Sequence, residues 1–153
     1  MQPRLFARKI SSGAYKAMTG LQAYVEQCSL EKSLLERLNI RASQINGCAN
    51  CLVMHTTDAR KPGESEERMH LLYAWREAPR FTARERVALA WLAALTKITK
   101  GHAPNEVYEE ARQQFSEKEL ADLTMHAVAI NSWNRFAIAF RATPKVTTAT
   151  AAV

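Results

Sequence analysis

The chain has 153 residues, of which 47% are hydrophobic and 24% are charged, a length and balance typical of one soluble globular domain. Its formal net charge of +6 comes without a helix-turn-helix, zinc-finger or RNA-binding signature, so generic surface charge is favoured over nucleic-acid binding. No apolar run approaches the roughly 18 residues of a membrane span, and no signal-peptide core follows the basic N-terminus, so we expect a cytoplasmic protein that binds no membrane.

Apolar residues recur at helical spacing almost throughout and strand signals are nearly absent, which predicts an all-α fold. A first helix is expected over residues 12–27. A second should begin with Ser29 as its N-cap and end at Asn46, because Gly47 suits a left-handed helix end. The third should cover residues 48–61, where a Pro-Gly pair prevents its continuation.

The middle of the chain predicts two further helices. Residues 64–76 have acids first and apolar residues at helical spacing after them. Residues 82–85 form a capping box, which opens a helix that is apolar nearly all round over residues 87–95. Such a helix should be buried on all sides, and Lys100-Gly101 should end it.

The last third predicts a short polar helix over residues 105–115 and then a long one. A second capping box at residues 116–119 opens this final helix, which should run toward Phe140. The Thr/Ala-rich segment 142–153 is expected to be a disordered tail. We therefore predict one compact helical domain over residues 1–141.

The residues with the clearest chemical pattern are Cys48, Cys51 and His55. Spacings of three and four residues place all three side chains along one stripe of a helix. Because the preceding helix ends at Gly47, Cys48 falls at a helix N-terminus, where free N–H groups and the macrodipole favour a thiolate. A thiolate, a second thiol and a base are the minimum set for peroxide reduction or disulfide exchange.

Glu36 is a fourth candidate, on a face of the preceding helix that can fold back over the two cysteines. A lone acid on a helix is ordinarily a solvated surface residue. Glu36 is considered as a functional residue because the cysteine pair follows it. We assign Cys51 as the thiol that attacks, because His55 lies one turn away and can take its proton. Cys48 is the resolving thiol, at a helix start that an external reductant is expected to reach.

Glu36, Cys48, Cys51 and His55 at these spacings resemble the signature of AhpD-like alkylhydroperoxidases, in the carboxymuconolactone decarboxylase superfamily. The likeness spans residues 5–141. The stretches that are also similar to single-domain bacterial members are 41–48, 73–77, 88–91 and 131–135.

The resemblance implies an all-helical fold that assembles into a homotrimer or homohexamer. It also implies a peroxidase cycle in which the two cysteines alternate between dithiol and disulfide, while Glu36, His55 and a water relay a proton. The position before the second cysteine is often His or Tyr in the family and here is Asn50, so a shorter relay is expected. The substrate that the resemblance implies is a hydroperoxide. The electron donor stays open between a small thiol, a lipoyl protein and a thioredoxin-like protein. No cofactor is expected.

Three other functions remain open at this point. A zinc site would have three ligands in the CxxC motif and His55, but a structural zinc site needs four. Lactone decarboxylation, the other activity in the superfamily, does not depend on a CxxC motif. A non-enzymatic oxidant sensor would use the same thiols as a peroxidase.

Two further features are interpreted as structural. Cys28 stands alone, and a lone cysteine is usually a small buried apolar residue that should stay reduced. The polar residues 131–134 interrupt the apolar face of the last helix. We interpret them as an exposed or hydrogen-bonded segment. The alternative is that Asn131 or Asn134 reaches a subunit interface or the thiol pocket.

Overall fold

The structure is a computed structural model that describes residues 2–144. Helices make up its regular structure, and no β-strand occurs within these residues, which confirms the all-α prediction. No helix in the described range is long and apolar enough to cross a bilayer. Of the tail predicted at 142–153, residues 142–144 form no helix and residues 145–153 lie outside the described part.

The helices follow one another through the chain with short connections. They are α1 (Ala7–Ile10), α2 (Ser12–Glu26), α3 (Lys32–Asn46), α4 (Ala49–Arg60), α5 (Glu66–Leu71), the 3₁₀ turn η1 (Leu72–Ala74), α6 (Ala83–Thr96), α7 (Asn105–Gln114) and α8 (Glu117–Ala139).

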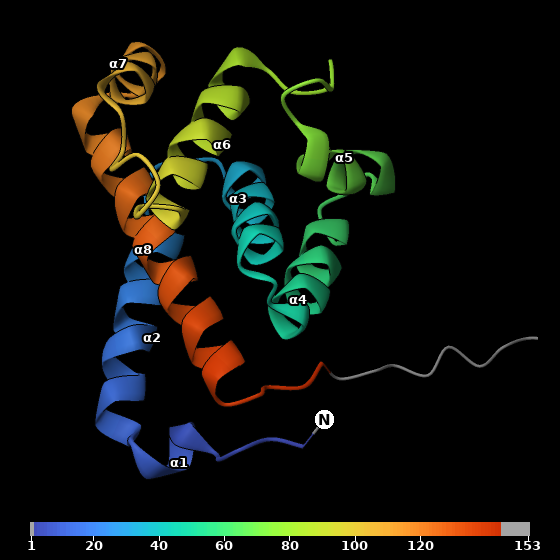
Figure 1. The fold of residues 1–153 in the computed structure, drawn as a ribbon, viewed down its shortest axis with the longest axis vertical. Helices are drawn as coiled ribbons and strands as arrows, with labels where there is room; N and C mark the ends of the chain where they lie inside the picture. The colour runs from blue at the N-terminus through green and yellow to red at the C-terminus, as the bar shows by residue number, and fades with distance from the viewer. Residues whose placement is uncertain (1, 145–153) are drawn as a thin grey trace, which may run out of the picture.

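Helix α3 lies in the middle of the bundle. In Figure 1 it stands between α4 on one side and α6 and α8 on the other, and it packs against all three and against η1. Leu38 and Ile40 on α3 have no exposed surface. Because α3 is covered on several sides, its polar side chains must either pair with neighbouring helices or line small cavities.

Several predicted helix ends are confirmed. Thr82 and Ser116 each accept a hydrogen bond from the backbone three residues on, and the glutamates at those positions complete both capping boxes. Gly47 ends α3 with φ 71°, in the left-handed region that a residue with a side chain rarely adopts. No side chain between residues 87 and 95 is exposed, but only Ala88, Leu89, Trp91 and Leu92 are buried, so the expected burial on all sides is confirmed in part.

Three predicted boundaries were wrong. Ser29 caps no helix: Leu30 is buried in the core, and α3 starts only after an extended Glu31. The helix expected over 64–76 begins after its N-cap Ser65 and tightens into the 3₁₀ turn η1. The helix expected to reach Lys100 ends at Thr96, whose hydroxyl is tied to α8 by a hydrogen bond.

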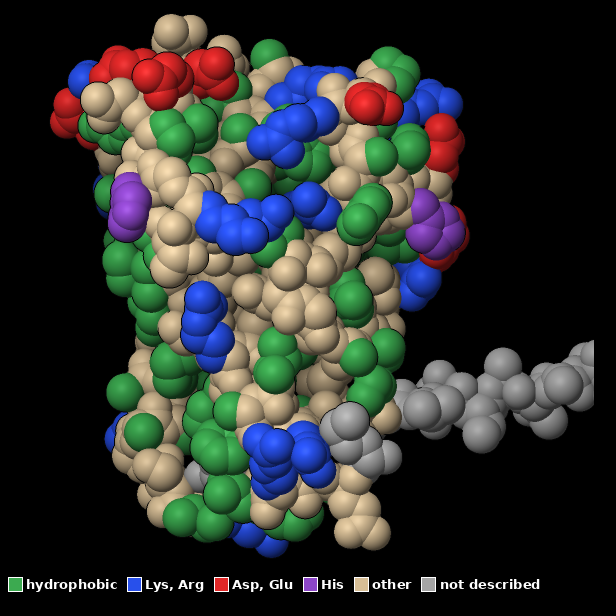
Figure 2. Space-filling view, viewed as in Figure 1, with side chains coloured by type: hydrophobic (Ala, Val, Ile, Leu, Met, Phe, Trp, Pro, Cys, Tyr) green, Lys and Arg blue, Asp and Glu red, His purple; other side chains and the backbone are tan. Residues whose placement is uncertain are grey.

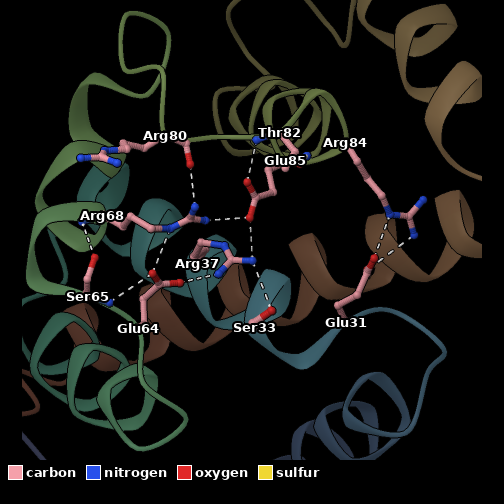
Figure 3. A network of polar contacts seen from close by, with 10 residues as sticks. All are labelled: Glu31, Ser33, Arg37, Glu64, Ser65, Arg68, Arg80, Thr82, Arg84 and Glu85. Carbon is pink, nitrogen blue, oxygen red and sulfur yellow. Dashed lines mark hydrogen bonds and ion pairs between the residues drawn. The ribbon is translucent and has the colours of Figure 1, made fainter.

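A buried ion-pair network joins α3 to the segments around α5 and α6 (Figure 3). Arg37 of α3 pairs with Glu64 and, at 2.8 Å, with Glu85. Arg68 pairs with the same two carboxylates, at 3.0 and 2.7 Å. Each of these four side chains is therefore paired with two opposite charges. The pairs hold α3 in place at Arg37, the residue that follows Glu36.

Candidate active site

The site is built on the hairpin of α3 and α4. Gly47 turns the chain in its left-handed conformation, and the backbone N–H of Cys48 donates to the carbonyl of Ser43 at 3.0 Å. Cys48 is the N-cap of α4, in an extended conformation. The predicted location of this cysteine at a helix N-terminus is thereby confirmed.

Cys48 and Cys51 are joined by a disulfide, with their Cα atoms 5.3 Å apart. The backbone N–H of Cys51 donates to the Sγ of Cys48 at 3.4 Å. Cys28 is a free, half-buried thiol. The CxxC pair can therefore exist as a disulfide within one helical turn, while the third cysteine takes no part in it.

Both cysteines of the pair are buried, with exposed fractions of 2% for Cys48 and 3% for Cys51. Cys48 therefore does not lie at an open helix start, contrary to expectation, and its reaction with an external reductant stays a prediction. The cause is tertiary: α4 packs against α3 and α8.

His55 and Glu36 meet across the hairpin. Nδ1 of His55 lies 3.3 Å from Oε2 of Glu36, at the long end of hydrogen-bond distances. The same carboxylate oxygen accepts from the amide of Asn39 at 3.4 Å. His55 is 8% exposed and follows Cys51 by one turn on α4. The antiparallel hairpin thus brings together the four residues that the sequence singled out.

This arrangement can move a proton away from a thiol. A carboxylate beside an imidazole favours the imidazolium that forms when the histidine accepts a proton. Because the pair is largely buried, its attraction is less screened than on a surface. Asn50, the residue before the second cysteine, is half-buried in the same turn.

A buried set of amides holds the turn before Cys48. The side chain of Asn46 donates to Oδ1 of Asn131 at 2.9 Å and to Oδ1 of Asn134 at 2.8 Å. Asn134, with 0% exposure, donates in turn to Ser43 at 3.2 Å. The interpretation of 131–134 as hydrogen-bonded was correct, but these asparagines are buried rather than exposed. In the sequence, the sign of this contact was the run of polar residues 131–134 on an otherwise apolar helix face.

No role was predicted for His126 from the sequence. It lies on α8, buried in the interior and close enough to Glu36 and His55 for both to affect its pKa. Burial is the main cause that lowers the pKa of His126 to about 4, against the opposing charge of Glu36. Within residues 2–144, no group of three His, Cys, Asp or Glu side chains is arranged to hold a metal ion. The alternative of a zinc site at the CxxC motif and His55 therefore finds no fourth ligand among the described residues.

Comparisons with known proteins agree with this fold. Residues 13–94 match the sequence model of the carboxymuconolactone decarboxylase family. The chain is 38% identical over 139 residues to the uncharacterised protein YdfG of Bacillus subtilis (strain 168), covering 91% of this chain and 95% of that protein.

Two solved structures are similar over most of the chain. One is a protein of unknown function from Agrobacterium tumefaciens, suggested to be the antioxidant defence protein AhpD. It has a TM-score of 0.92 and 40% identity, and the match covers 95% of this chain and 99% of that one. The other is an uncharacterised peroxidase-related protein from Silicibacter sp. TM1040, with a TM-score of 0.80 and 25% identity over 92% of this chain and 74% of that one.

Proposed function

We propose that this chain, which belongs to the carboxymuconolactone decarboxylase family, is a thiol-dependent peroxidase that cycles Cys48 and Cys51 between dithiol and disulfide. The observation that carries the proposal is the contact of His55 with Glu36, one helical turn from a cysteine pair that is joined as a disulfide. A base beside a dithiol is what peroxide reduction requires.

The cycle has three balanced steps. The thiol of Cys51 gives its proton to His55, and the thiolate attacks the terminal oxygen of a hydroperoxide. The O–O bond breaks, Cys51 becomes a sulfenic acid, and the leaving alkoxide takes the proton back from His55 to form an alcohol. The thiol of Cys48 then displaces water from the sulfenic acid to form the disulfide, and two thiols of an external donor reduce it again.

Glu36 stabilises the charged state of the relay. When His55 holds the proton it becomes an imidazolium, and the carboxylate at 3.3 Å lowers the free energy of that state. Asn39 donates to the same oxygen and so keeps the carboxylate turned toward His55. Of the two similar solved structures, one is suggested to be an antioxidant defence protein and the other is termed peroxidase-related, which supports this class of activity.

The electron donor is a small thiol, a lipoyl protein or a thioredoxin-like protein, and we place the reaction in the cytoplasm. A reducing compartment would return the disulfide to the dithiol after each turnover. Because both cysteines are nearly fully buried, the donor has little direct access to the disulfide.

An oxidant sensor is the second candidate, and the same burial favours it. A disulfide that a donor reaches slowly would persist and could act as a signal rather than as an intermediate. The two functions differ in turnover: an enzyme consumes many equivalents of peroxide per subunit, and a sensor stops after one.

The test is peroxide consumption by the reduced protein with each class of donor, namely glutathione, dihydrolipoamide and thioredoxin with its reductase. We expect continuous consumption with at least one donor and none with Cys51→Ser. The matched control is Cys28→Ser, which should behave as wild type. A single equivalent consumed with every donor would favour the sensor, and no reaction of the thiols with peroxide would refute both functions.

A further inference from the structure

Arg41 on α3 is a nearly buried cation without a carboxylate partner. The residue is 9% exposed, and no acid forms an ion pair with it among residues 2–144. Its one hydrogen bond in this range runs from Nη1 to the amide oxygen of Gln44 at 3.1 Å, and its Nε is buried without a partner. Because an arginine stays charged in a protein, this guanidinium is a positive charge that no described residue neutralises.

The preceding arginine on the same face of α3 is treated differently by the fold. Arg37 lies one turn earlier and pairs with two carboxylates, those of Glu64 and Glu85. For Arg41, burial and then the positive charge of Arg76 lower the pKa, which shows an environment that disfavours the charged form. The described part of the chain therefore supplies counter-charges for Arg37 and none for Arg41.

Arg76 is a second cation without an acidic partner. It is exposed and follows η1, the turn that packs against α3. Within residues 2–144 no carboxylate pairs with it, and its charge is close enough to act on Arg41. Two like charges at short range repel each other, and the repulsion is relieved when an anion lies between them.

Aromatic rings hold the two guanidinium groups in place. Cζ of Arg41 lies 5.6 Å from the centroid of the Tyr73 ring, and Cζ of Arg76 lies 4.3 Å from that of Trp75, a core residue. Tyr73 is 77% exposed, so this arginine patch (Arg41, Tyr73 and Arg76) opens to solvent. Nη2 of Arg41 has no hydrogen bond among the described residues and is not buried, so a ligand can reach it.

We propose that the arginine patch binds an oxoanion, a carboxylate or phosphate group, between Arg41 and Arg76. Such a group supplies the negative charge and the acceptor oxygens that both guanidinium groups lack. The N–H fork of a guanidinium matches two oxygens of a carboxylate or phosphate, which gives shorter and stronger hydrogen bonds than a neutral acceptor does. The hydroxyl of Tyr73 is a further donor beside them.

Two sources can supply this group. One is a small organic acid or phosphate in solution. The other is an acidic side chain of a second copy of the chain, such as Glu109 on α7, which is exposed and has no ion pair among the described residues. The chemistry of recognition is the same for both, and the experiment separates them.

The test measures the thermal midpoint of the full-length protein with inorganic phosphate or with citrate, at constant ionic strength made up with sodium chloride. The variants are Arg41→Met, which keeps an apolar stem without the charge, and Arg76→Gln. The matched control is Arg80→Gln, which removes an exposed arginine that already pairs with Glu67. Light scattering gives the mass of each protein.

With a small-molecule ligand, we expect the midpoint of the wild type and of Arg80→Gln to rise with phosphate or citrate until the site is saturated. Arg76→Gln should weaken the apparent affinity about tenfold to hundredfold, the loss that corresponds to one charged hydrogen bond. Arg41→Met should abolish the response. In chloride alone it should melt no lower than wild type, because it removes a buried charge that has no partner. All four proteins should have the same mass.

An acid of a second copy predicts a different result: Arg41→Met and Arg76→Gln lose mass, and Arg80→Gln does not. The proposal would be overturned if phosphate and citrate act equally on all four proteins and the masses agree, since that is a general salt effect. A lower midpoint of Arg41→Met under those conditions would assign it a structural role. If circular dichroism shows that Arg41→Met does not fold, the comparison of Arg76→Gln with Arg80→Gln decides.

Discussion

Nδ1 of His55 lies 3.3 Å from Oε2 of Glu36, although 19 residues separate the two in the chain. The contact joins the middle of α4 to the first half of α3 and places a carboxylate beside the only base within one turn of Cys51 on its helix. The proposed chemistry depends on this contact.

Glu36→Gln should slow the reaction of the thiols with peroxide by about 10²–10⁴-fold, as expected when a general acid–base pair loses its charge. The amide keeps the shape of the side chain, so the melting temperature should stay nearly unchanged. Stopped-flow oxidation at neutral pH measures the rate. The control is Glu31→Gln, which removes an exposed acid paired with Arg84 and should react as wild type. Equal rates for the two variants would remove Glu36 from the mechanism.

Cys51 should be the cysteine that forms a sulfenic acid. His55 follows Cys51 by one turn and can accept its proton. The Sγ of Cys48 instead accepts a hydrogen bond from the backbone N–H of Cys51 at the N-terminus of α4. If this helix end had the larger effect on thiol pKa, Cys48 would be the thiolate. Dimedone labelling of Cys48→Ser and Cys51→Ser after peroxide addition, read by mass spectrometry, separates the two. Label should appear in Cys48→Ser. Label in Cys51→Ser alone would reverse the roles.

Asn134→Ala should destabilise the protein by about 1–3 kcal/mol, because Asn46 and Ser43 lose a fully buried hydrogen-bond partner. Urea unfolding measures the change in the free energy of unfolding. Ser132→Ala on the same helix is the control, since its hydroxyl bonds only the carbonyl of Val128, and it should cost less than about 0.5 kcal/mol. A small effect of Asn134→Ala would mean that water replaces the amide.

Glu85 should contribute to stability at neutral pH and lose that contribution in acid. Burial alone would raise its pKa, but the backbone N–H of Thr82 and the charges of Arg37 and Arg68 outweigh burial and hold its pKa below the ordinary 4.5. A carboxyl group whose pKa is lower in the folded protein stabilises the fold at pH values above its unfolded-state pKa. This stabilisation is lost as the pH falls through the folded-state pKa.

Glu85→Gln should therefore cost about 1.5–3 kcal/mol at pH 7, the size of a charged hydrogen bond, and progressively less below about pH 4.5. Urea midpoints between pH 7 and pH 3 measure this difference. Glu67→Gln, which removes an exposed pair with Arg80, should change little at any pH. A cost of Glu85→Gln that does not depend on pH would assign its role to shape rather than charge.

The protein should be a homotrimer or homohexamer in solution. Several large apolar side chains are exposed, including Phe6 at 69%, Ile10 at 73% and Tyr73 at 77%. In Figure 2, hydrophobic side chains lie on the surface over much of the molecule's length, while acidic side chains gather mainly at one end, near α7. Light scattering should give three or six times the chain mass of 17.2 kDa. A stable monomer at micromolar concentration would contradict this.

The sequence by itself determined the features that depend on neighbouring residues. The all-α class, both capping boxes, the left-handed Gly47 and the helical stripe of Cys48, Cys51 and His55 follow from spacings within one or two turns. Local backbone preferences and i, i+3 or i, i+4 contacts are enough to specify them.

Only the tertiary structure decided which side chains from different helices meet. Packing of α3 against α4 and α8 sets the distance from Glu36 to His55 and the amide contacts of Asn134. It also buries both cysteines of the pair and the imidazole of His126. Patterns of apolar spacing show which face of a helix is buried, but the relative shift of two packed helices is set by the fit of their side chains. The sequence therefore identified the thiols and their base, and packing placed the carboxylate that completes the relay.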